Sequence, residues 1–177
     1  NALPTAYSVT GGGSYCAGGS GLSVGLSNSA SGVNYQLYRA GSAVGTPVAG
    51  TGSSISFGLQ TVAGSYTVVA TNATTGCTSN MTGSATITVN TAPTAFTVTG
   101  GGAYCSGPGN HIYLSGSQTG VSYRLYTGST PVGAPVTGTG AAIDFGSFTT
   151  VGTYTVIASS TSSSCTTTMT GSASITS

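Results

Sequence analysis

The sequence contains the same eight-residue phrase twice. VTGGGSYC ends at Cys16, and VTGGGAYC ends at Cys105, 89 positions later. After one deletion the offset becomes 88 and holds along the rest of the repeat. Matching pairs with this second offset are Val33/Val121, Tyr35/Tyr123, Phe57/Phe145, Tyr66/Tyr154, Cys77/Cys165 and Met81/Met169. The period predicts two tandem domains, residues 1–89 and 90–177. The chain starts and stops at the same point of the repeat, which favours two units of a longer array.

Each repeat has the pattern of short β-strands. Apolar and polar residues alternate in GLSVGLS and VNYQLY, and Gly, Ser, Thr and Asn clusters separate such segments every 8 to 12 residues. Seven strands within each repeat of fewer than 90 residues predict an all-β fold of two tandem immunoglobulin-like β-sandwich domains. The strands expected in the first repeat are Tyr7–Thr10, Leu22–Ser27, Asn34–Arg39, the segment AVGTPVAG, Ser54–Gly58, Ser65–Thr71 and Ala85–Val89.

Several phrases carry a more specific resemblance. SYCAGGSGLSVGLS, NYQLYRAG, GSYTVVATNATTGC and SATITVN resemble the immunoglobulin-like repeats of large secreted and surface proteins of Bacteroidota. Gliding-type adhesins and other cargo of the type IX secretion system carry such arrays. The resemblance implies an extracellular, mechanically extended protein at the bacterial surface, without catalytic residues. The family often has Trp where Tyr35 and Tyr123 stand here, and its Asp-rich loops are absent, so we do not expect calcium binding.

The charge composition excludes several functions. Only 2% of the residues are charged, with two Arg, one Asp and neither Lys nor Glu. A chain near zero net charge does not attract nucleic acid or an anionic membrane by its field. No apolar stretch approaches the roughly 18 residues of a membrane span. Low charge also weakens the usual protection against self-association, so we expect further copies of the same repeat as partners.

The same composition argues against an enzyme and against cofactors. Asp144 is the single carboxylate and His111 the single imidazole, and the first repeat has Ser23 and Ser56 in their places. General acid–base catalysis needs poised titratable groups, so a structural role for His111 is favoured. The cysteines are not clustered as zinc ligands are. We interpret the Gly11–Gly13 and Gly100–Gly102 runs as connections between the first two strands rather than nucleotide-binding loops.

Two sets of aromatic residues are candidates for specific roles. Alternation along the third strand points Tyr38 and Tyr126 outward, near Arg39 and Arg124, where they could contact sugars or a partner subunit. Ordinary packing on the sheet surface is the favoured alternative. Tyr66 and Tyr154, at the start of the sixth strand, resemble the tyrosine corner of immunoglobulin domains, which has a structural role.

The four cysteines suit an oxidising, extracellular compartment. Two pairings are open. Cys16 with Cys77 and Cys105 with Cys165 would bond within each repeat. The strand count favours Cys16 with Cys165 instead, because the segment before the second strand and the segment after the sixth lie at opposite ends of a sandwich. Cys77 and Cys105 would then remain for the preceding and following units.

These observations favour a structural repeat unit of an extracellular filament or adhesin stalk, built as a head-to-tail array. The alternative is a glycan- or protein-binding module of a secreted protein. A third hypothesis is assembly by strand sharing, in which Tyr7–Thr10 completes the sheet of a neighbour.

Overall fold

The structure is a computed structural model that describes residues 2–177, so the first residue of the predicted domain 1–89 lies outside it. Every regular element in that range is a β-strand, and the 17 strands confirm the predicted all-β fold. Contacts separate two compact units, of which the first ends at Asn90 and the second runs from Thr91 to Ser177. The first unit ends at Asn90 because its last strand includes that residue.

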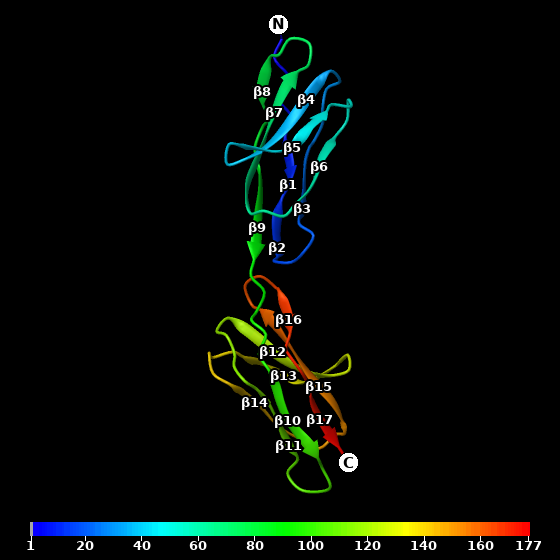
Figure 1. The fold of residues 1–177 in the computed structure, drawn as a ribbon, viewed down its shortest axis with the longest axis vertical. Coiled ribbons are helices and arrows are strands. Elements are labelled where there is room, and N and C mark those ends of the chain that lie inside the picture. The colour runs from blue at the N-terminus through cyan, green and yellow to red at the C-terminus, as the bar shows by residue number, and fades with distance from the viewer. Residues whose placement is uncertain (1) are drawn as a thin grey trace. The chain divides into compact units, whose positions relative to one another are not determined.

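The first unit is a sandwich of two sheets whose strands are antiparallel, except that β2 runs parallel to β9 (Figure 1). One sheet has the order β1-β3-β6, and the other has the order β2-β9-β7-β4-β5, with β8 also paired to β7. Its strands are β1 (Val9–Gly11), β2 (Gly13–Cys16), β3 (Leu22–Leu26), β4 (Val33–Arg39), β5 (Ser42–Ala49), β6 (Ile55–Gln60), β7 (Gly64–Asn72), β8 (Thr78–Asn80) and β9 (Ala85–Asn90). All seven predicted strands are present, and β2 and β8 are additional.

The second unit repeats this arrangement with one difference. Here the first strand, β10, is unbroken and belongs to both sheets, so they join in the order β13-β12-β15-β17-β10-β11-β14, with β16 paired to β15. Its strands are β10 (Val98–Ala103), β11 (Asn110–Leu114), β12 (Val121–Thr127), β13 (Thr130–Thr137), β14 (Ile143–Phe148), β15 (Gly152–Ser160), β16 (Thr166–Thr168) and β17 (Ala173–Thr176).

Alternation along the strands builds one core per unit. On β4 the side chains of Val33, Tyr35 and Leu37 are buried, while Asn34 between them is exposed. The equivalent residues of β12 and the facing side chains of β15 do the same in the second unit. Tyr35 and Tyr123 are fully buried in their respective cores, where they supply the large aromatic group that a sandwich of small residues needs.

The glycine triplet is a kink within the first strand, and its interpretation as a connection between strands is wrong. Before the kink, β1 pairs with β3, and after it β2 pairs in parallel with β9 on the other sheet. Gly11, Gly12 and Gly13 have φ angles of 93°, 81° and 126°, which only glycine adopts readily. A Cβ at Gly11 would lie 2.0 Å from the Ser23 carbonyl oxygen, and one at Gly12 would lie 2.6 Å from that of Thr86. The triplet thus moves one strand between two sheets.

We therefore expect Gly12→Ala to destabilise the first unit by more than about 2 kcal/mol, since it adds both backbone strain and a clash. Gly32→Ala is the matched control, because Gly32 has φ +78° with no atom within 4 Å of the added Cβ; its cost should be about 1 kcal/mol. Hydrogen exchange read by mass spectrometry measures each unit separately. Equal costs at the two positions would contradict a role for close packing at the kink.

Candidate functional site

The two cysteines of the first unit lie at opposite ends of its sandwich. We call the end where the chain enters a unit its N-terminal pole, and the end where it leaves the C-terminal pole. Cys16 is opposite Asn90, the last residue of β9, in the parallel pairing of β2 with β9, which places it at the C-terminal pole. The Gly64 end of β7 pairs with β9, whereas Cys77 follows the Asn72 end, where β8 pairs (Figure 1).

The length of β7 decides which bonds are possible. Its nine residues span about 25–30 Å, and a disulfide needs Cα atoms within about 7 Å. The second unit follows the same rule. Gly152, at one end of β15, pairs with β17 beside β10, whereas Cys165 follows the other end. Cys105 therefore lies at the C-terminal pole and Cys165 at the N-terminal pole of their unit.

The chemical states of the cysteines agree with this geometry. Cys16 and Cys165 are both disulfide-bonded, whereas Cys77 and Cys105 are free thiols. The alternative pairings within each repeat, Cys16 with Cys77 and Cys105 with Cys165, are therefore not those of the structure. A separation of a whole strand length between the poles is the reason.

The loops that carry Cys77 and Cys165 have the same backbone conformation. The Asn72 N–H donates to the Cys77 carbonyl at 2.9 Å, and the Ser160 N–H donates to the Cys165 carbonyl at 2.8 Å. The preceding residue is left-handed in both loops, with φ 70° at Gly76 and 57° at Ser164. A loop that holds a bonded cysteine in one unit thus holds a thiol in the other.

Tyr66 and Tyr154 make the hydrogen bond of a tyrosine corner. The Tyr66 hydroxyl donates to the Val62 carbonyl at 2.7 Å, and the Tyr154 hydroxyl donates to the Thr150 carbonyl at 2.8 Å. Both rings are buried, at 0% and 2% exposure. The bond fixes the chain where it crosses from one sheet to the other before β7 or β15.

Sequence reasoning missed a second hydroxyl network, at the N-terminal pole. The buried Tyr35 hydroxyl accepts from the Ala30 N–H at 2.9 Å, and the Tyr123 hydroxyl accepts from the Gln118 N–H at 2.8 Å. Nearby, the buried Ser29 hydroxyl donates to Ser53 and accepts from Thr51 across the loops. The signal was present as Tyr at the usual position of Trp, since a phenol brings a polar group that must be satisfied when buried.

The predicted surface contacts are only partly assembled. Tyr38 and Tyr126 are half-buried on the faces of β4 and β12 that point away from the core. Arg124 is two residues from Tyr126 and shares its face, and its Nε is buried without a hydrogen-bond partner. Arg39 lies on the opposite face of β4 from Tyr38. Its aliphatic stem lies against Gly64, as shown by the 3.0 Å that would separate a Cβ at Gly64 from the arginine Cδ. The two repeats therefore do not present one common tyrosine–arginine site.

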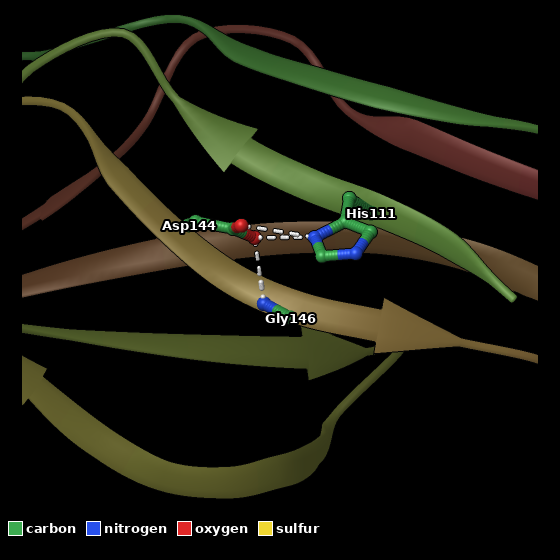
Figure 2. A network of polar contacts seen from close by, with 3 residues as sticks. All are labelled: His111, Asp144 and Gly146. Carbon is green, nitrogen blue, oxygen red and sulfur yellow. Dashed lines mark hydrogen bonds and ion pairs between the residues drawn. The ribbon is translucent and has the colours of Figure 1, made fainter. Parts of the chain in front are cut away.

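The one histidine and the one aspartate of the sequence lie together on the second unit. His111 on β11 hydrogen-bonds through Nδ1 to both carboxylate oxygens of Asp144 on β14, at 2.9 Å, and the Gly146 N–H donates to Asp144 at 2.8 Å (Figure 2). The imidazole also stacks on Tyr113, with ring centroids 5.7 Å apart. The His111 bond first, and the Gly146 N–H second, lower the pKa of Asp144 from its ordinary value of 3.8.

The first unit has an uncharged version of the same cross-strand pair. Ser23 and Ser56, which align with His111 and Asp144, lie with their hydroxyls 3.3 Å apart, and the Gly58 N–H donates to Ser56 at 3.1 Å. The pair therefore joins two neighbouring strands in both units. Both side chains of the ionic version are about half exposed, at 46% and 47%. This geometry agrees with the structural role predicted for His111.

Among residues 2–177, no three His, Cys, Asp or Glu side chains gather as metal ligands would. The same residues include no helix of the length and apolarity that a membrane crossing requires.

Comparisons with known proteins add only a general likeness. No protein-family model matches the chain, and no curated protein matches it. The human OSCAR ligand-binding domain is 14% identical, with 98% of this chain and 100% of that chain covered and a TM-score of 0.38. The fibronectin(III)-like modules of CbhA from Clostridium thermocellum are 12% identical, with 94% and 92% covered and a TM-score of 0.45. This level of likeness concerns the sandwich fold and says nothing of function.

The corner hydroxyls should each stabilise their own unit. Tyr66→Phe removes one buried hydrogen bond, so we expect a loss of about 1 kcal/mol in the first unit alone, and Tyr154→Phe should do the same in the second. Tyr126→Phe is the control, because its hydroxyl has no hydrogen bond to any described residue; its effect should stay below about 0.5 kcal/mol. Unit-resolved hydrogen exchange measures the losses. A loss spread over both units would contradict the local role.

The ion pair predicts a pH dependence in the second unit. A carboxylate with a lowered pKa stabilises the fold fully above its unfolded value, here 3.8, and loses that contribution as the pH falls through the folded pKa. Replacing the pair by its counterparts from the first repeat, His111→Ser with Asp144→Ser, should flatten the stability profile of the second unit as the pH falls below the unfolded value of 3.8. Unit-resolved hydrogen exchange at several pH values tests this. An unchanged acid slope in the double variant would refute it.

Proposed function

We propose that this chain is a structural repeat unit of an extracellular filament or adhesin stalk, in which immunoglobulin-like domains follow one another head to tail. The observation that carries the proposal is the location of the cysteines. Each unit has one cysteine at each pole and no disulfide within itself. Cysteines at the poles serve links along a row of domains, whereas a domain that folds alone usually has its disulfide inside.

In this proposal Cys16 bonds to Cys165 across the junction of the two units. The pairing register supports this bond. Cys16 is opposite Asn90 in β2 and β9. Cys165 lies in the loop before β16, at the N-terminal pole of the second unit. A bond between these two cysteines would fix the orientation of neighbouring domains.

The bonded cysteines and the fold are typical of extracellular domains. The resemblance of the repeat phrases to Bacteroidota surface proteins leads us to propose the bacterial surface as the location and type IX secretion as the export route. A nearly uncharged surface also fits the proposal, because it offers little repulsion between neighbouring domains. Other copies of the repeat are then the main partner.

The second candidate is a glycan- or protein-binding module, with the half-buried Tyr126 and Arg124 as its contact surface. It ranks lower because the first repeat has no equivalent, since Gln36 stands in place of Arg124 and donates instead to the backbone of β4 and β5. Strand sharing ranks lowest. Val9–Gly11 pairs with β3 of its own unit. The outer strand β5 contains Pro47 and pairs with β4 through an irregular register, which discourages a further strand.

Electron microscopy of the native source should show thin filaments with a regular axial repeat, and the gene should encode further copies of VTGGG-YC. Binding by Tyr126→Ala and wild type to a glycan array is the matched test of the alternative. A compact source protein without filaments, together with glycan binding lost in Tyr126→Ala, would overturn the filament proposal in favour of a binding module.

Peptide mapping under non-reducing conditions tests the junction. Digestion of the purified chain, with thiols blocked beforehand, should yield a peptide pair that contains Cys16 and Cys165, while Cys77 and Cys105 should carry the blocking group. Recovery of Cys16 linked to Cys77 would contradict the proposed junction.

A further inference from the structure

The free cysteines occupy the two positions at which the other repeat is oxidised. Cys77 aligns with Cys165, and Cys105 aligns with Cys16. Cys165 and Cys16 are disulfide-bonded, whereas Cys77 and Cys105 are thiols. The chain therefore has one free cysteine at the N-terminal pole of its first unit and another at the C-terminal pole of its second unit.

We propose that Cys105 of one copy forms a disulfide with Cys77 of a second copy, so that each new junction reproduces the bond proposed within the chain. This inference rests on the proposed head-to-tail array and adds a covalent link between copies to it. Each pole is thus occupied by the opposite pole of another copy of this chain.

The Cys77 loop is already in the conformation of a bonded loop. It has the same backbone hydrogen bond to the cysteine carbonyl as the loop of Cys165, and the same left-handed residue before the cysteine. Because the backbone needs no rearrangement, bond formation costs little ordering at this end. The Cys77 side chain is half-buried.

Cys105 is the accessible partner. It is exposed in the loop after β10, and β10 ends beside β17, where the Tyr104 N–H donates to the Thr176 carbonyl at 2.7 Å. This pairing directs the loop to the C-terminal pole, as β2 and β9 direct Cys16 in the first unit. The charge on the chain does not oppose contact between poles, because no Lys or Glu is present anywhere in it.

The bond forms by thiol–disulfide exchange with a small disulfide as oxidant. The Cys105 thiolate attacks one sulfur of the oxidant and displaces one thiolate. The Cys77 thiolate of the second copy then attacks the Cys105 sulfur of the mixed disulfide and displaces the other. Two protein thiols and one small disulfide become one protein disulfide and two small thiols, so the oxidant is reduced by two electrons.

The test uses the full chain with oxidised glutathione as the small disulfide. Wild type should give a ladder of dimers, trimers and longer species on a non-reducing gel, and reducing agent should collapse it to monomer. Cys77→Ser alone and Cys105→Ser alone should lose the ladder. An equimolar mixture of the two variants should stop at a dimer, in which mapping finds Cys105 linked to Cys77.

Two outcomes would overturn the proposal. One is the absence of a ladder in wild type. The other is a mixture in which dimers that link the two different variants are no more frequent than both kinds of like dimer counted together. Random collision without pole recognition gives that result. Cys77→Ala, and wild type with thiols blocked by iodoacetamide, repeat the test should Cys77→Ser fail to fold, as judged by circular dichroism of the monomer.

This experiment separates the link from the proposed function. Filaments in the native source without a specific Cys105–Cys77 ladder would sink the covalent link and leave the array in place. A specific ladder from the purified chain, together with a native source that shows no filaments, would support pole recognition and contradict the filament.

Discussion

The rest of the structure depends on one strand changing sheets. Each unit begins with a strand whose first half pairs with β3 or β11 and whose second half pairs in parallel with β9 or β17. Glycines make the crossing possible, because positive φ angles are open to glycine and because a Cβ at Gly11 or Gly12 would lie only 2.0 or 2.6 Å from a neighbouring carbonyl oxygen. The crossing closes one edge of both sheets, and it carries the first cysteine of each unit to the C-terminal pole.

That single constraint connects the fold with the proposed function. Without the crossing, the first strand would stay beside β3 and would not reach β9 on the other sheet. With it, Cys16 is level with Asn90, the residue at which the chain leaves the unit. The long uninterrupted β7 and β15 then keep the other cysteine a full strand away. A domain of this topology has no short path for an internal disulfide, so its cysteines are suited to links along a row.

Much of the fold could be predicted from the sequence because alternation is a local property. The segments around Tyr35, Val68 and Ile87 show period two, and each became a strand with those residues buried. The separation of Cys16 from Cys77 also followed from strand count alone. The role of the glycine triplet did not, since GGG between two strands looks the same whether the chain turns or crosses. The pairing of β8 with β7 was missed because TSN has no apolar residue to signal a strand.

The candidate sites show the same division between local and distant information. The tyrosine corner was predictable because Tyr66 and its acceptor Val62 are four residues apart. The pairing of His111 with Asp144 joins residues 33 positions apart, and no spacing in the sequence announces it. Comparison of the two units then interprets it, because Ser23 and Ser56 form the equivalent contact without charge. A function common to both repeats must reside in what both retain, which is the kink, the corner and a cysteine at each pole. The ion pair varies between them, so it belongs to the stability of one unit rather than to the shared task.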